Sequence, residues 1–181
     1  MSDTTSHIAE RAAQLRREFD RSFAEPFRVD REDREDLLGI RVGTHACALR
    51  LSEIAGLFID KKITRVPGGT PALRGIAGFR GALLPVYDLA MLLGHGSAPA
   101  RRWLVVAAAA PVAFAFDAFE RQLRVAREEI LPHSARQEGL SYAREIVRTR
   151  TFVGPVLSLP AILAALKAPA TAQVGKRSNV A

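Results

Sequence analysis

The residue of this sequence best suited to molecular recognition is Arg80, which stands in the stretch Phe79-Arg80-Gly81-Ala82 between two apolar runs. A guanidinium group binds carboxylates through paired hydrogen bonds and also stacks on flat surfaces. The flanking runs predict two strands joined by a tight turn, so a partner could reach Arg80. No acid–base or metal-binding set accompanies it in the sequence. The stretch therefore predicts a contact surface on a β scaffold.

Residues that could bind a metal or catalyse a reaction form no complete set. His45 and Cys47 would share one face of a strand, but two ligands are too few for zinc, and the other histidines are distant in sequence. We interpret Cys47 as a small core residue. The sequence contains neither the G-x-S-x-G motif of a nucleophilic serine nor the G-x-x-x-x-G-K motif of a phosphate-binding loop. We expect a protein that is not an enzyme, with no metal and no cofactor.

The net charge of +7 over 181 residues raises the question of nucleic-acid binding. The arginines, however, are scattered and interleaved with acids, as in residues 28–36. No RNP-like aromatic motif, zinc-finger spacing or clear helix-turn-helix is present in the sequence. These features favour a solvated surface of mixed charge. A small basic β-barrel nucleic-acid-binding protein is kept as the alternative function.

Features that would direct the chain out of the cytoplasm are missing from the sequence. The N-terminus lacks the apolar region of a secretory signal. The longest apolar run, residues 103–116, is interrupted by Pro111 and is shorter than the roughly 20 residues of a membrane-spanning helix. Cys47 is the single cysteine, which excludes an internal disulfide. We expect a cytoplasmic protein without direct membrane insertion.

The two ends of the chain differ in composition from its centre. Residues 7–24 predict an amphipathic helix, because one face of it would be lined by Ile8, Ala12, Leu15, Phe19 and Phe23. This helix could pack on the following domain, which we favour, or bind a partner. Residues 1–36 are thus assigned to an N-terminal helix and linker. Residues 167–181 are polar and predict a disordered tail.

From residue 37 the pattern changes to short strands. The sequence predicts strands over 38–42, 46–51, 54–59, 63–66, 74–80 and 82–87, followed by a helix over 88–93. The breaker Pro67-Gly68-Gly69 separates the fourth strand from the fifth.

The second half of this region resembles the first. Residues 48–67 align without gaps on 113–132, an offset of 65, and residues 81–93 align on 154–166, an offset of 73. The order of the blocks is preserved, which favours duplication of a small β unit closed by a helix. A sheet of about 60 residues is marginal alone and leaves reactive edges, whereas two packed barrels share a core. We therefore expect a domain over 37–166, with one subdomain over 37–100 and a second, intimately packed, over 101–166.

The order of these elements resembles the CheW-like domain, the adaptor domain of bacterial chemotaxis arrays. Family members carry the patterns T-x-V-P-x-x-P, V-I-N-L-R-G and L-P-V-x-D-L in this order. They correspond here to Thr64-Arg65-Val66-Pro67 with Pro71, to Ile76-Ala77-Gly78-Phe79-Arg80-Gly81, and to Leu84-Pro85-Val86-Tyr87-Asp88-Leu89. Two positions depart from the family: Gly78 stands where it has asparagine, and Gly56 where a glutamate is usual.

The resemblance implies a mainly β fold of two SH3-like five-stranded barrels with short helices, here preceded by the N-terminal helix. It also implies a non-catalytic adaptor that joins the cytoplasmic tip of methyl-accepting chemoreceptors to the regulatory domain of a CheA-type histidine kinase. Such a protein would be cytoplasmic and would gather at the receptor array on the membrane.

The family arginine of the turn belongs to the contact surface, and by position it is Arg80. The partner-binding residues implied on the first barrel are Arg80, Gly81, Phe79, Ile59, Val66 and Pro67. A CheW-like regulatory paralogue that does not activate the kinase is the other alternative.

Overall fold

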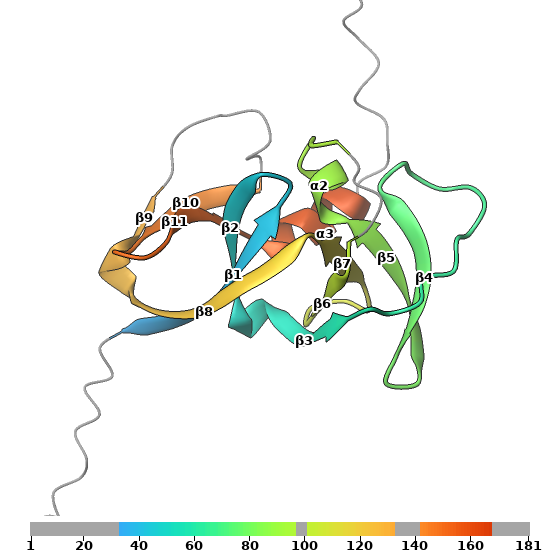
Figure 1. Cartoon of the computed structure of the whole chain (residues 1–181), viewed down its shortest axis with the longest axis horizontal. Helices are drawn as coiled ribbons and strands as arrows, with labels where there is room; N and C mark the ends of the chain where they lie inside the picture. Colours follow the sequence, from blue (N-terminus) through green and yellow to red (C-terminus); the bar gives the residue numbers. More distant parts are fainter. Residues whose placement is uncertain (1–32, 97–100, 133–141, 168–181) are drawn as a thin grey trace, which may run out of the picture. The chain divides into compact units, whose positions relative to one another are not determined.

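The computed structural model describes residues 33–96, 101–132 and 142–167 (Figure 1). In both of its sheets, strands from before residue 100 pair with strands from after it. The predicted N-terminal helix over 7–24 lies outside the described residues. So does the predicted tail over 167–181, except for Lys167, which is the last residue of a helix. Residues 133–141 also lie outside the described residues. The described residues from Arg34 onward belong to one compact unit.

One sheet has six strands, taken from both ends of this unit. Their order is β8 (Ala118–Ala126), β1 (Arg34–Val42), β2 (His45–Arg50), β11 (Val153–Leu157), β10 (Ala143–Arg148) and β9 (Ile130–Pro132). All pairings are antiparallel except β11 with β2, which is parallel. β1 begins at Arg34, earlier than predicted, because its first residues pair with the end of β8.

The other sheet has five strands from the middle of the chain. Their order is β3 (Ile54–Ile59), β6 (Trp103–Ala107), β7 (Ala113–Phe116), β5 (Ala82–Asp88) and β4 (Leu73–Phe79). Here too a single pairing, β5 with β7, is parallel. The expected subdomain boundary near residue 100 therefore does not separate the two sheets, because each sheet combines strands from both sides of it. The mainly β, two-sheet expectation is confirmed, although β9 gives one sheet a sixth strand.

The first block of the predicted repeat is confirmed by the strand register. Each copy carries a β-bulge at the same place, between Ile54 and Gly56 on β3 and between Phe119 and Arg121 on β8. In sequence β8 is preceded directly by β7, whereas β2 is followed by the short 3₁₀ helix η1 (Leu51–Glu53). The offset of 65 thus relates residues in equivalent positions of the two sheets.

The second block is also repeated, but its predicted offset of 73 is wrong. Ile76 pairs with Pro85 in one sheet and Ile146 with Pro155 in the other, which gives an offset of 70. The same offset relates the parallel pairings of Val86 with Ala113 and Val156 with Ala48. The gap-free alignment matched helix residues by hydrophobicity alone, whereas hydrogen-bond register fixes the strands that precede them.

Each repeat ends in a helix whose first turn is capped by the residue before it. Asp88 accepts hydrogen bonds from the backbone N–H groups of Ala90 and Met91 at the start of α2 (Leu89–Leu92). At the equivalent position Ser158 accepts one from Ala161 N in α3 (Leu159–Lys167). Such caps satisfy donors that a helix N-terminus leaves without partners. The predicted helix over 88–93 is confirmed within one residue at each end.

The main core is shared by both sheets and both helices. Its members include Ile40 and Leu49 of the six-stranded sheet, Phe114 of the five-stranded sheet, Leu89 of α2 and Ile162 of α3, all completely buried. A second cluster is formed mainly by residues of the six-stranded sheet, and a third, around Phe79 and Val86, by residues of the five-stranded one. This arrangement matches the expectation of two small β units with a common core.

The strand predicted over 63–66 is reduced to a single bridge. Thr64 exchanges backbone hydrogen bonds with Ile76, at 2.8 and 2.9 Å, and no further pairing follows in the described part of the chain. Pro67 lacks a donor, and Gly68 and Gly69 adopt positive φ angles of 79° and 114°, which turn the chain away. The close approach of Thr64 explains Gly75, where a Cβ would lie 2.1 Å from the Thr64 carbonyl oxygen.

Candidate functional site

The β4–β5 hairpin ends in a two-residue turn formed by Arg80 and Gly81. Phe79 and Ala82 pair across it, and both turn residues have positive φ angles, 47° and 86°. Such hairpin turns favour Asn-Gly, because glycine adopts the left-handed conformation freely and asparagine tolerates it better than most other residues. Arginine at this position costs on the order of 1 kcal/mol. The predicted tight turn with an exposed Arg80 is confirmed. The backbone conformation of Arg80 in this turn is unfavourable for arginine.

The Arg80 guanidinium lies over an aromatic ring of β3, the strand at the opposite edge of the five-stranded sheet. Its Cζ is 5.9 Å from the centroid of Phe58, and the Lys61 ammonium is 5.4 Å from the same centroid. Phe58 in turn packs edge-on against Phe79, with ring centroids 5.0 Å apart. Cation–π contacts of this kind contribute about 0.5–1 kcal/mol at exposed sites. They hold both cations beside the tip of the hairpin.

The residues predicted to bind a partner divide into exposed and buried positions. Arg80, Gly81 and Pro67 are exposed, and Ile59 and Val66 are exposed to 45% and 43%. Phe79 differs from the expectation: only 4% of it is exposed, because alternation along β4 turns its ring into the sheet. The buried Phe79 ring thus packs against Phe58 and helps to hold it in place.

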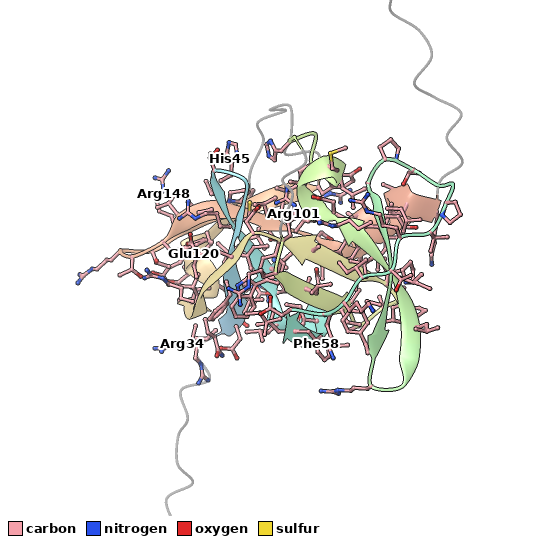
Figure 2. All side chains as sticks on the ribbon, turned by 45° about the vertical axis from the view of Figure 1, so that its right-hand side comes forward. Arg34, His45, Phe58, Arg101, Glu120 and Arg148 are labelled. Atoms are coloured by element: carbon pink, nitrogen blue, oxygen red, sulfur yellow. The ribbon has the colours of Figure 1, made fainter. Side chains whose placement is uncertain are left out.

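Three further residues near the hairpin were not predicted from the sequence: Phe58, Lys61 and Leu83. Phe58 lies at the lower edge of the molecule in Figure 2, on β3. Its role depends on β3 and the hairpin approaching each other, which no local pattern shows. Leu83 could have been noticed from strand alternation, because it faces opposite to the buried Leu84 on β5.

A buried ion network lies between the sheets, with Arg101 near the centre of Figure 2. Arg101 Nε is 2.8 Å from Asp88 Oδ1, and its side chain is completely buried. Arg101 also pairs with Asp117, which accepts a hydrogen bond from Gly43 N at 2.6 Å. Arg74 reaches Asp88 at 3.3 Å. The network connects the α2 cap with the β1–β2 turn, and so positions one sheet against the other.

The sequence of the unit matches a model of the CheW-like domain family over residues 36–167. The chain belongs to the CheW-like domain family. The match extends from β1 to the end of α3 and therefore includes the hairpin and the ion network. The resemblance found in the sequence motifs is thereby confirmed.

Two similar proteins share limited sequence with this CheW-like chain. Protein PilI of Pseudomonas aeruginosa is 31% identical over 65 residues, which is 36% of this chain and 36% of PilI. The chain thus matches about a third of the length of that relative. The scaffolding protein TtCheW of Thermoanaerobacter tengcongensis has a similar structure, with a TM-score of 0.63 and 17% identity. That similarity covers 69% of this chain and 89% of the other, and shows a common fold.

His45 and Cys47 lie two apart in the regular register of β2 and so share a strand face as expected, but they differ in exposure. His45 is exposed, whereas Cys47 is buried, and burial raises the pKa of its thiol to about 12. His45 instead stacks on His95, with ring centroids 4.5 Å apart and planes inclined by 12°. Parallel rings direct their nitrogen lone pairs side by side, which does not suit a common metal ion. The described residues contain no cluster of three or more potential metal ligands.

Within the described ranges, no helix has the length and apolarity needed to cross a bilayer.

Proposed function

We propose that this CheW-like chain is a non-catalytic adaptor that couples chemoreceptors to a CheA-type histidine kinase, and that the hairpin side of the five-stranded sheet is a contact surface. The observation that carries the proposal is Arg80, an exposed cation kept on a left-handed turn and steadied by Phe58. Membership of the CheW-like family supports an adaptor in chemotaxis-like signalling. The structural similarity to a protein described as a scaffold supports the same function.

The mechanism is positional. An adaptor that contacts a receptor and a kinase together raises the effective concentration of one near the other. If it binds one arrangement of the kinase more tightly, it shifts the kinase towards that arrangement by the difference in binding free energy. A rigid scaffold suits this task, because its binding groups do not have to be ordered at the moment of association. The shared core and the Arg101 network provide that rigidity.

The surface chemistry divides the work between two kinds of side chain. Ile59 and Val66 provide apolar area, and Arg80 provides a directional group for carboxylates. Buried arginines and aromatic residues carry much of the energy in protein interfaces. The partners proposed are the receptor cytoplasmic tip and the kinase regulatory domain, at a cytoplasmic array near the membrane.

The direct test is charge reversal at the turn. Because Arg80 is exposed and makes only a weak contact with Phe58, Arg80→Glu should change the melting temperature little. It should weaken binding to the kinase regulatory domain or to the receptor tip by about tenfold or more. Isothermal titration calorimetry with each purified partner provides the measurement.

A matched control lies in the other sheet. Arg150, exposed in the β10–β11 turn, is related to Arg80 by the offset of 70. Arg150→Glu makes the same change in net charge away from the hairpin and should have the smaller effect. Equal affinity of wild type and Arg80→Glu would remove Arg80 from the interface. Salt-sensitive retention of nucleic acid, with no binding of either protein partner, would contradict the adaptor function itself.

A further inference from the structure

Gly78 is a glycine that the fold does not require. Its φ angle is outside the positive range that favours glycine, and a Cβ placed on it would meet no heavy atom within 4 Å. Gly75, on the same strand, is the contrast, because a Cβ there would collide with a backbone oxygen at 2.1 Å. Gly78 is exposed, so its missing side chain leaves an open place on the outer face of β4. Neither backbone conformation nor packing explains this residue.

Leu83 lies directly opposite this open place. Gly78 and Leu83 are partners in the β4–β5 register, and 72% of Leu83 is exposed. A side chain at Gly78 would cover part of Leu83, since cross-strand neighbours have Cβ atoms about 5 Å apart. A partner side chain resting on Gly78 against Leu83 would remove apolar surface of Leu83 from water, which favours binding.

Positively charged residues lie near the hairpin turn that adjoins the pair. Arg80 and Lys61 share the Phe58 ring next to the hairpin turn. Thr64 pairs antiparallel with Ile76, so the chain leading back to Lys62 runs alongside β4 in the direction of Gly78.

The acid nearest to these cations in sequence is already paired. Both carboxylate oxygens of Asp60 accept hydrogen bonds from Arg102, at 2.7 and 2.5 Å, which lowers the pKa of Asp60. Asp60 therefore offsets little of the charge of Lys61 and Lys62. Lys62 beside Gly78 and Arg80 in the adjoining turn thus form a cationic rim next to the open apolar place.

We propose that Gly78 and Leu83 form a seat for one protruding apolar side chain of the partner, flanked there by carboxylates. The seat deepens the proposed function and rests on it, because its occupant belongs to the receptor or the kinase. Charge complementarity identifies the occupant: an apolar residue among acids suits the seat and its rim. A second copy of this chain does not suit it through the matching face of the other sheet, where Arg148 is the partner of Val153.

Filling the seat tests the proposal. Gly78→Val adds a β-branched side chain that suits a strand and has free space, so the fold should retain its melting temperature. Binding to the kinase regulatory domain or to the receptor tip, whichever binds wild type more tightly, should weaken by about tenfold. Gly78→Ala, with a smaller side chain, should weaken it less. Leu83→Asp should also weaken binding, and Val153→Asp, its equivalent in the other sheet, should weaken it less.

Salt tests the charge of the rim. Raising the salt concentration from about 0.05 M to about 0.5 M should lower wild-type affinity several-fold, because the contact is exposed and charged. Wild-type affinity for Gly78→Val in a folded protein would overturn the seat while leaving the adaptor function intact. Binding that does not respond to salt would overturn its acidic occupant. Failure of wild type to bind either partner would instead overturn the proposed function, and the seat with it.

Discussion

Replacing Asp88 by serine isolates the contribution of the buried ion network from that of the helix cap. Serine can still accept a hydrogen bond from the first turn of α2, as Ser158 does for α3. It removes the charge that Arg101 faces at 2.8 Å in a completely buried position. Asp88→Ser therefore changes the ion pair and leaves a cap in place.

The expected cost follows from the surroundings of Arg101. Breaking a buried ion pair from one side costs about 3–5 kcal/mol. Arg101 keeps Asp117 as a second partner, so we expect the lower end, about 3 kcal/mol, or a fall of about 10 °C in melting temperature. Ser158→Ala, which removes only a cap, should cost about 1 kcal/mol. Adding Arg101→Leu to Asp88→Ser should restore part of the loss, because it removes the uncompensated charge.

Urea unfolding provides the assay. The chain has one tryptophan, Trp103, which is half-buried on β6 and stacks on Phe116, so its fluorescence should report unfolding of the common core. The comparison is between the free energies of unfolding of wild type, Asp88→Ser, Ser158→Ala and the double variant Asp88→Ser/Arg101→Leu. A cost of Asp88→Ser equal to that of Ser158→Ala would refute the reasoning, since the network would then contribute no more than a cap.

Two further predictions concern backbone packing and pH. Gly75→Ala should destabilise the domain by several kcal/mol, because the added Cβ meets the Thr64 carbonyl at a positive φ of 140°. Gly78→Ala is the control and should leave the melting temperature nearly unchanged in the same thermal scan, because its Cβ has free space and strands disfavour glycine. Equal effects would contradict the assigned contact. Burial, His45 and Arg101 lower the pKa of His95, so the unfolded state binds its proton first as the pH falls. Stability should decrease as the pH falls below about 6.5, and His95→Gln should flatten that decrease; an unchanged slope would exclude the stacked pair as its source.

Local elements of this chain could be predicted from its sequence because their causes are local. The hairpin follows from two alternating runs around Arg80-Gly81, and the α2 start follows from Asp88 before an apolar run. The strand predicted over 63–66 forms only one bridge, because Pro67 and the two glycines after it turn the chain away. Its bridge partner, Ile76 on β4, does not follow from the local pattern. Strand boundaries elsewhere moved by a few residues, as at Arg34.

Partner choice between strands could not be predicted in the same way. The repeat indicated two equivalent units, but nothing local decides whether β1 pairs with β3 of its own repeat or with β8 of the other. Hydrophobicity placed the second block three residues out of register, because leucine-rich helices match at several offsets. Buried Arg101 follows a polar stretch and reads as a loop residue until Asp88 and Asp117 are brought to it.

The candidate site was predicted in part. Arg80, Gly81, Ile59, Val66 and Pro67 are exposed as expected, and their role in binding stays a prediction. The buried position of Phe79 and the participation of Phe58 depend on how β3 approaches the hairpin. Gly78 was visible in the sequence as a departure from the family. Its meaning depends on the register that places Leu83 opposite.

Kinase activity in a reconstituted array tests the adaptor function most directly. A CheA-type kinase and receptor-containing membranes from the same organism would be combined with wild-type chain, with Arg80→Glu, or with no addition, and kinase autophosphorylation followed. The adaptor function predicts that wild type makes kinase activity depend on the receptor, and that Arg80→Glu does so only at concentrations about tenfold higher. Receptor control of the kinase that is the same with and without the wild-type chain would contradict it.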